Sequence, residues 1–174
     1  MSENNIFFGP EQSSAILDLL QSIFIAEIIC PSPNLSFFFG WMSDVELINN
    51  EASEFSSLEP EWPHSMVRLS DVIKALLKRG CKISIVLKDE EHNRKVEKEI
   101  IKRCQEYSGL LKIHWDEHEH KKVIVGDDFV VEGSMNLTKN GLNTNKESIT
   151  FNTETKDVSD WRQMVNEIFK DLQK

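Results

Sequence analysis

Residues 120–136, with the sequence HKKVIVGDDFVVEGSMN, bring together side chains that could act on a phosphodiester. His120 and Lys122 are two residues apart on an expected strand, so their side chains project to the same face, about 6.6 Å apart along the chain. After an expected turn, Ser134 and Asn136 supply a hydroxyl and an amide. An imidazole can attack phosphorus and hold a covalent intermediate, while a fixed cation and hydrogen-bond donors stabilise charge on the non-bridging oxygens. The segment therefore predicts a phosphodiester site.

The same spacing resembles the HKD motif of the phospholipase D superfamily. The residues that carry the resemblance are His120, Lys122, Asp127, Gly133, Ser134 and Asn136. The stretch SMNLTKNGLNTNKES is similar to the segment after Gly-Ser in small bacterial members, including an acid, Glu147, at the start of the next strand. The resemblance implies that Ser134, Asn136 and Glu147 act with the His–Lys pair.

The motif acid has two candidates. The family usually has six residues between this Asp and the Gly, and here Asp127 is followed by five before Gly133. Asp128 is the alternative, with the extra residue lying before it.

A single motif implies a dimer, because the family's chemistry uses two histidines, one as nucleophile and one as acid. Small single-motif relatives form two-fold dimers with a shared active site, and symmetric dimers are the commonest oligomers.

The function that the resemblance implies is that of a nuclease that cleaves DNA or RNA without metal or cofactor. The alternative is a catalytically silent subunit that binds nucleic acid or a partner protein. The stretches WMSDVEL and GSMNLTKNG also resemble, more weakly, phospholipase D-like proteins of bacterial DNA-modification and phage-defence cassettes.

The elements that position these residues alternate between helix and strand. Pro10 opens an apolar-periodic helix, Ser70 caps a second that Gly80 ends, and further helices are expected at about 90–107 and 158–172. The expected strands are 35–41, 81–88, 110–115, 120–126, 128–133 and 147–152. This order predicts one α/β domain over residues 1–174, a mixed sheet flanked by helices in a phospholipase D-like sandwich.

Residues 42–67 stand apart from this pattern. They are rich in Ser, Asn, Glu and Pro, which predicts a long irregular insertion, and loops of this length often bind a partner. The adjoining pair Trp41–Met42 is expected in the core rather than as a substrate platform.

Composition restricts the setting. A net charge of −9 is unusual for a protein that grips phosphates electrostatically, so a local field or a partner must contribute. Three widely spaced cysteines predict free thiols in a reducing compartment. The apolar stretch AILDLLQSIFIAEIIC is interrupted by three polar residues, which argues against a membrane span, and we expect a cytoplasmic protein.

A metal site is the competing interpretation of HWDEHEH, residues 114–120. His118 and His120 would share a strand face, but no second cluster accompanies them. We therefore expect a solvated acidic loop with incidental histidines and no bound metal.

Overall fold

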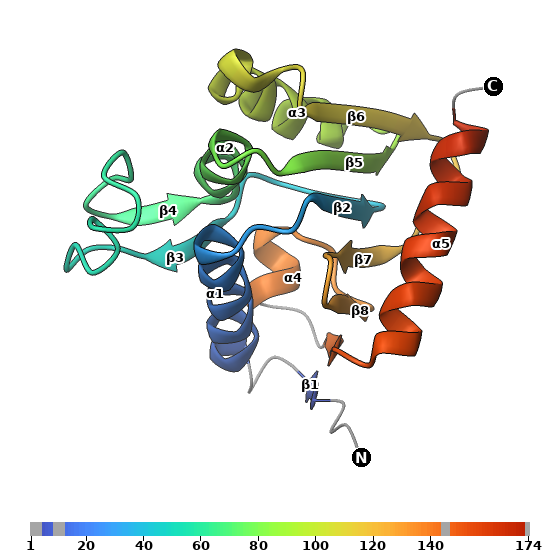
Figure 1. Ribbon diagram of the computed structural model, residues 1–174, viewed down its shortest axis with the longest axis horizontal. Helices are drawn as coiled ribbons and strands as arrows, with labels where there is room; N and C mark the ends of the chain where they lie inside the picture. The colour runs from blue at the N-terminus through green and yellow to red at the C-terminus, as the bar shows by residue number, and fades with distance from the viewer. Residues whose placement is uncertain (1–4, 9–12, 144–146, 173–174) are drawn as a thin grey trace.

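A seven-stranded mixed sheet organises the chain in the computed structural model, which describes residues 5–8, 13–143 and 147–172 (Figure 1). The strand order is β1-β9-β8-β7-β2-β5-β6. Strands β2, β5 and β6 are mutually parallel, and the remaining pairings are antiparallel. The bounds are β1 Asn5–Phe8, β2 Asn34–Phe39, β5 Lys82–Lys88, β6 Leu111–Asp116, β7 Lys122–Val125, β8 Val130–Gly133 and β9 Ser148–Asn152. The predicted mixed α/β fold is confirmed.

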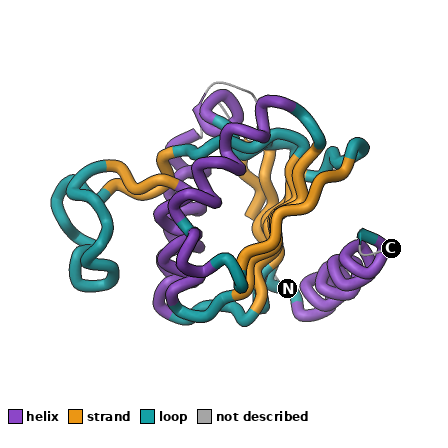
Figure 2. Tube along the Cα trace, turned by 90° about the horizontal axis from the view of Figure 1, so that it is seen from above, coloured by secondary structure: helices purple, strands orange, loops and turns teal. Residues whose placement is uncertain are grey.

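Helices cover both faces of the sheet. The bounds are α1 Ser13–Ile29, α2 Leu69–Lys78, α3 Glu91–Arg103, the 3₁₀ turn η1 Gln105–Tyr107, α4 Lys139–Asn143 and α5 Thr155–Asp171. Helices α1 to α4 lie on one side of the sheet and α5 on the other (Figure 2). The two cores follow this division, since Phe37 and Phe39 of β2 face the larger cluster, whereas Phe38 packs with Val158 and Val165 of α5. The alternation of β2 thus builds a core on each face.

The expected boundaries of the first two helices agree with the structure only in part. Pro10, expected to open the first helix, and residues 144–146 lie outside the described residues. Gly80 follows α2 with a φ of 89°, as expected for a glycine that ends a helix. Ser70 is not the cap of α2, because the helix already begins at Leu69. Instead, Asp44 accepts hydrogen bonds from the Ser70 amide at 2.8 Å and from its hydroxyl at 2.9 Å.

The prediction that residues 42–67 are irregular is correct for residues 50–65, which form turns and bends, but two short strands flank them. Together they form an arm, here defined as residues 46–68, built on the two-stranded sheet of β3 (Glu46–Asn49) and β4 (Met66–Arg68), which projects from the body (Figure 2). The buried Asn50 side chain ties the tip together, because it accepts from the Phe55 amide and donates to the Pro63 carbonyl. These strands are too short to show the apolar pattern by which strands are recognised in a sequence, and side-chain hydrogen bonds hold the arm together.

The arm is also fastened to α2 by charge. Glu59 is almost fully buried and pairs with Arg79 at 2.6 Å and with Lys78 at 3.1 Å. Burial raises the pKa of Glu59, but the hydrogen bonds from Arg79 and Lys78 outweigh it and hold the pKa below its usual value. The arm is therefore an ordered part of the domain.

His114 of β6 packs against α5 with a buried ring nitrogen. Its ring lies 5.2 Å from that of Phe169, and its Nε2 is buried with no hydrogen-bond partner within the described structure. Burial, aided by the charge of Lys112, lowers the pKa of His114.

We therefore expect stability to fall as the pH drops below about 6.5, where the unfolded chain binds this proton before the folded one does. Above that pH the contribution is fully present. His114→Phe should make the fall of the melting temperature between pH 7 and pH 5 shallower, as measured by thermal unfolding. His118→Phe, a change at an exposed histidine, is the control. An unchanged slope in His114→Phe would contradict this account.

Two further predictions concern membrane association and the cysteines. Within the part of the chain that the structure describes, no helix is long and apolar enough to cross a membrane. Cys30, Cys81 and Cys104 are free thiols. Burial raises the pKa of Cys81 to about 12 and that of Cys104 to about 11, so both are unreactive at neutral pH.

Candidate active site

The direction of four strands gathers the motif at one edge of the sheet. Strand β2 is antiparallel to β7, so its carboxyl end lies beside the amino end of β7, where Phe39 pairs with Lys122. Strand β8 returns antiparallel to β7, and β9 is antiparallel to β8. Residues that precede β7 and β9 therefore lie beside residues that follow β2 and β8. We call this the motif edge: Gly40, His120, Lys122, Gly133, Ser134, Asn136 and Glu147.

The structure brings His120 and Lys122 together, although not by the predicted route. Strand β7 begins at Lys122, so His120 lies in the preceding loop rather than two residues along the same strand. The Lys122 ammonium donates to the main-chain carbonyl of His120 at 2.5 Å. His120 is exposed and Lys122 is partly buried. A cation is thus held next to an accessible imidazole-bearing residue, which suits a substrate that arrives from solvent.

Asn136 is oriented by the end of β2. Its side-chain Oδ1 accepts a hydrogen bond from the Trp41 amide at 3.1 Å, which leaves the amide nitrogen as the donor on its other side. Gly40 lies at the meeting point of these segments: a Cβ added there would be in ordinary contact with Asn136 Oδ1 at 3.7 Å and with the His120 Cα at 3.8 Å, and in tight contact with the Glu119 carbonyl at 3.3 Å. Asn136 and the main chain of His120 therefore lie close together, on either side of Gly40.

Ser134 and Glu147 hold each other. The Ser134 hydroxyl donates to Glu147 at 2.5 Å and accepts from the Ser148 amide at 3.1 Å. Gly133 brings β8 this close to β9, since a Cβ there would lie 2.0 Å from the Ser148 carbonyl oxygen. In this arrangement the Ser134 proton points to the Glu147 carboxylate rather than towards a substrate. The pair therefore positions the loop that carries Asn136.

Asp127 is not part of the motif edge, contrary to expectation. It follows β7, at the end of the strand opposite to Lys122, and its carboxylate pairs with Arg162 of α5 at 2.9 Å. Its main-chain amide donates to the Ser32 hydroxyl, which in turn donates to the buried Glu27. The alternative acid, Asp128, is exposed in the same β7–β8 turn. Both acids therefore lie at the end of β7 opposite to Lys122, and the structure gives Asp127 a contact with α5 rather than with the motif edge.

The two histidines of the metal interpretation do not share a strand face. His118 and His120 both lie in the exposed loop between β6 and β7, and the His118 amide donates to Asp116 at 2.8 Å. Among the described residues, no group of three or more His, Cys, Asp and Glu side chains could hold a metal ion.

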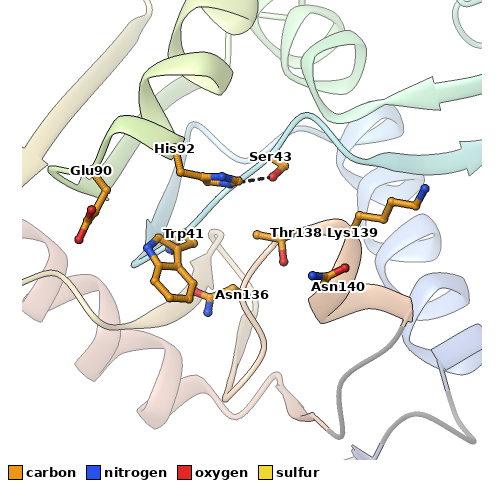
Figure 3. Close-up of a pocket in the computed structure, with 8 residues that line it drawn as sticks. All are labelled: Trp41, Ser43, Glu90, His92, Asn136, Thr138, Lys139 and Asn140. Carbon is orange, nitrogen blue, oxygen red and sulfur yellow. Dashed lines mark hydrogen bonds between the residues drawn. The ribbon is translucent and has the colours of Figure 1, made fainter.

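Sequence reasoning missed a pocket beside the motif edge. A pocket of about 520 Å³ opens next to Asn136 (Figure 3). Its lining residues are Trp41, Ser43, Glu90, His92, Asn136, Thr138, Lys139 and Asn140. Trp41 and Met42 were expected together in the core, and this is half wrong: Met42 is fully buried, but Trp41 is 51% exposed. The sequence did hold one indication of this exposure, because Trp41 stands at the very end of the expected strand 35–41, directly after Gly40.

The fold and this edge define a phospholipase D-like domain. Residues 45–170 match the family model described as "Cardiolipin synthase, PLD-like domain". The match covers more than half of the chain, so the chain belongs to this phospholipase D-like family.

Solved structures have the same fold at low identity. NucT from Helicobacter pylori has a TM-score of 0.63 at 18% identity, covering 97% of this chain and 96% of that chain. Nuc from Salmonella typhimurium, a phospholipase D family member, has a TM-score of 0.59 at 17% identity, covering 95% and 93%. Polyphosphate kinase from Porphyromonas gingivalis has a TM-score of 0.57 at 14% identity, covering 98% of this chain and 26% of that chain. A comparison with curated proteins found no match.

Proposed function

We propose that this protein is a metal-independent phosphodiesterase that cleaves DNA or RNA through a phosphohistidine intermediate. The observation that carries the proposal is the motif edge, where Lys122 donates to the main chain of His120 and Asn136 is oriented beside them. This arrangement supplies a nucleophile, a fixed cation and a neutral donor. Family membership supports it, and NucT and the phospholipase D family member Nuc share the fold over nearly their whole length.

The chemistry we propose runs in two steps. A His120 ring nitrogen attacks phosphorus and forms an N–P bond while the bond to the leaving oxygen breaks, and a second histidine gives that oxygen its proton. Water then attacks the phosphohistidine, the second histidine takes a proton from the water, and the N–P bond breaks to release a phosphate monoester. Lys122 and Asn136 stabilise the charge on the non-bridging oxygens throughout.

The second histidine comes, in this proposal, from a second copy of the chain. One protomer carries one motif, so a two-fold dimer with His120 of each copy at the interface completes the acid–nucleophile pair. An obligate interface of this kind buries roughly 2,000 Å² or more in total. A monomer that still cleaves substrate at micromolar concentration would contradict the dimer. We also propose a cytoplasmic setting, which the three free thiols support.

The function is tested with labelled single- and double-stranded DNA and RNA in the presence of EDTA. We expect cleavage to persist undiminished, because the proposed charge stabilisation comes from Lys122 and Asn136. Loss of cleavage in EDTA and its restoration by magnesium or zinc would contradict this.

A second candidate function is favoured by one observation, the net charge of −9, which disfavours nucleic-acid turnover by a free enzyme. In that case the chain is a silent subunit that binds nucleic acid or a partner in a bacterial defence complex, with the projecting arm as the partner surface (Figure 2). Binding without cleavage under all conditions of the EDTA experiment would support it.

A further inference from the structure

Trp41 presents a large aromatic surface at a fixed place beside the motif. Its side chain is 51% exposed, although its neighbours in the chain, Gly40 and Met42, are buried. The Trp41 amide donates to Asn136, and the Met42 amide donates to the fully buried Asn93 at 2.9 Å. Both sides of the Trp41 peptide are therefore anchored. Because the main chain of Trp41 is already ordered, a ligand that binds to the indole does not have to order it.

The pocket next to Trp41 has the size and lining of a site for a planar polar ligand. Its volume of about 520 Å³ falls within the range of small-ligand sites, roughly 300–1,000 Å³. Trp41 lies beside Asn136, with Glu90 and His92 above it in the view of Figure 3 and Thr138 and Asn140 across from it. Ser43 and His92 hydrogen-bond to each other at 3.0 Å. One aromatic face and several donors and acceptors thus surround the opening.

Charge alone does not favour a nucleic acid at this surface. The chain carries 29 acidic and 20 basic residues, so contacts to phosphates have little general attraction to build on. At the pocket, the Glu90 carboxylate is paired with Lys88 at 2.8 Å, and Lys139 adds a positive charge on the far side. Binding of a strand here must depend more on uncharged contacts, and stacking of a base on an aromatic ring is the strongest of these.

We propose that Trp41 and this pocket bind an unpaired nucleobase next to the phosphate that meets His120, which makes single-stranded nucleic acid the substrate class. Bases in a duplex are stacked on one another and cannot reach the indole face, whereas bases of a single strand can. Asn136 links the two sites, since it lines the pocket and belongs to the motif edge. The inference rests on the proposed function for the position of the phosphate.

The test measures binding in a His120→Ala background, so that substrate survives the measurement. We expect Trp41→Ala to weaken binding of a 12-nucleotide single strand by about 5- to 100-fold in fluorescence anisotropy, the range typical of one stacked base. Trp41→Phe, which keeps a ring, should lose much less. Duplex affinity and the salt dependence should not change, because no phosphate contact is removed. Ile101→Ala, at another exposed apolar residue (50%) on α3, is the matched control.

A set of strands with one abasic site each makes the test sharper. One abasic position should weaken binding to the Trp41 protein and have no further effect on Trp41→Ala, the non-additivity expected when two changes remove one contact. Additive effects at every position, or equal losses for single strand and duplex, would overturn the proposal. So would dissociation of the dimer in Trp41→Ala by sedimentation, because Trp41 would then be a protein contact.

The two proposals fail separately in these experiments. If the wild type cleaves nothing but the abasic and Trp41 effects coincide, the base site stands and the phosphodiesterase function fails. If the wild type cleaves single strand and duplex alike and Trp41→Ala is unaffected, the function stands and the base site fails.

Discussion

Replacing His120 with alanine is expected to reduce phosphodiester cleavage by at least about 10⁴-fold, because the change removes the nucleophile and, in the dimer, also the acid. His120 is exposed and lies before β7, so the truncation should leave the fold intact. Cleavage of a labelled oligonucleotide and the melting temperature, measured on the same sample, separate the two effects. His118→Ala, two residues earlier in the same exposed loop, should keep full activity.

Heterodimers test whether the two histidines share one site. Wild-type and His120→Ala protomers carrying different affinity tags can be mixed and the mixed dimer purified. It keeps one imidazole, which could attack phosphorus but would have no partner to protonate the leaving group. We therefore expect the mixed dimer to turn over about as slowly as the dimer in which both protomers carry His120→Ala. A rate of about half the wild-type value or better would mean independent sites and would exclude the shared-site mechanism.

The second large effect is expected from Lys122. Lys122→Ala should lower kcat/KM by about 10²- to 10³-fold, the cost typical of removing one group that stabilises charge in the transition state. The ammonium donates to the His120 carbonyl, so its loss also frees the loop that carries the imidazole. Steady-state kinetics on a labelled oligonucleotide measure the loss, and both kcat and KM should change.

Lys121 is the matched control for this prediction. It is adjacent in sequence and carries the same charge, but its ammonium pairs with Glu119 at 3.4 Å and lies 5.9 Å from the ring of Phe38, which faces the α5 core. Lys121→Ala should change kcat/KM only slightly. If the two variants lost activity equally, Lys122 would act through general charge or loop stability, and its assignment as the phosphate-binding cation would be wrong.

Local periodicity in the sequence determined most of the fold. Apolar spacing and glycine positions identified six of the sheet's seven strands and four of the helices around them, because each pattern reflects burial of one face of an element. The run LSFFFGW was correctly expected to be a buried strand, since its phenylalanines alternate between two cores. The two strands of the arm were not recognised, because they are short and the arm is held by polar contacts of Asn50 and Glu59 rather than by an apolar pattern.

The sequence by itself also named the candidate residues for the chemistry, since the prediction of His120, Lys122, Ser134 and Asn136 rests on their types and spacing. Only the tertiary structure decided how they are used. Strand direction placed Asp127 at the far end of β7 with Arg162, and the β8–β9 contact at Gly133 turned Ser134 towards Glu147. The physical reason is that spacing along a chain fixes neighbours within one element, whereas pairing between distant strands decides which ends meet. Trp41 follows the same rule, because its main-chain amide is held by Asn136, which is 95 residues away in the chain.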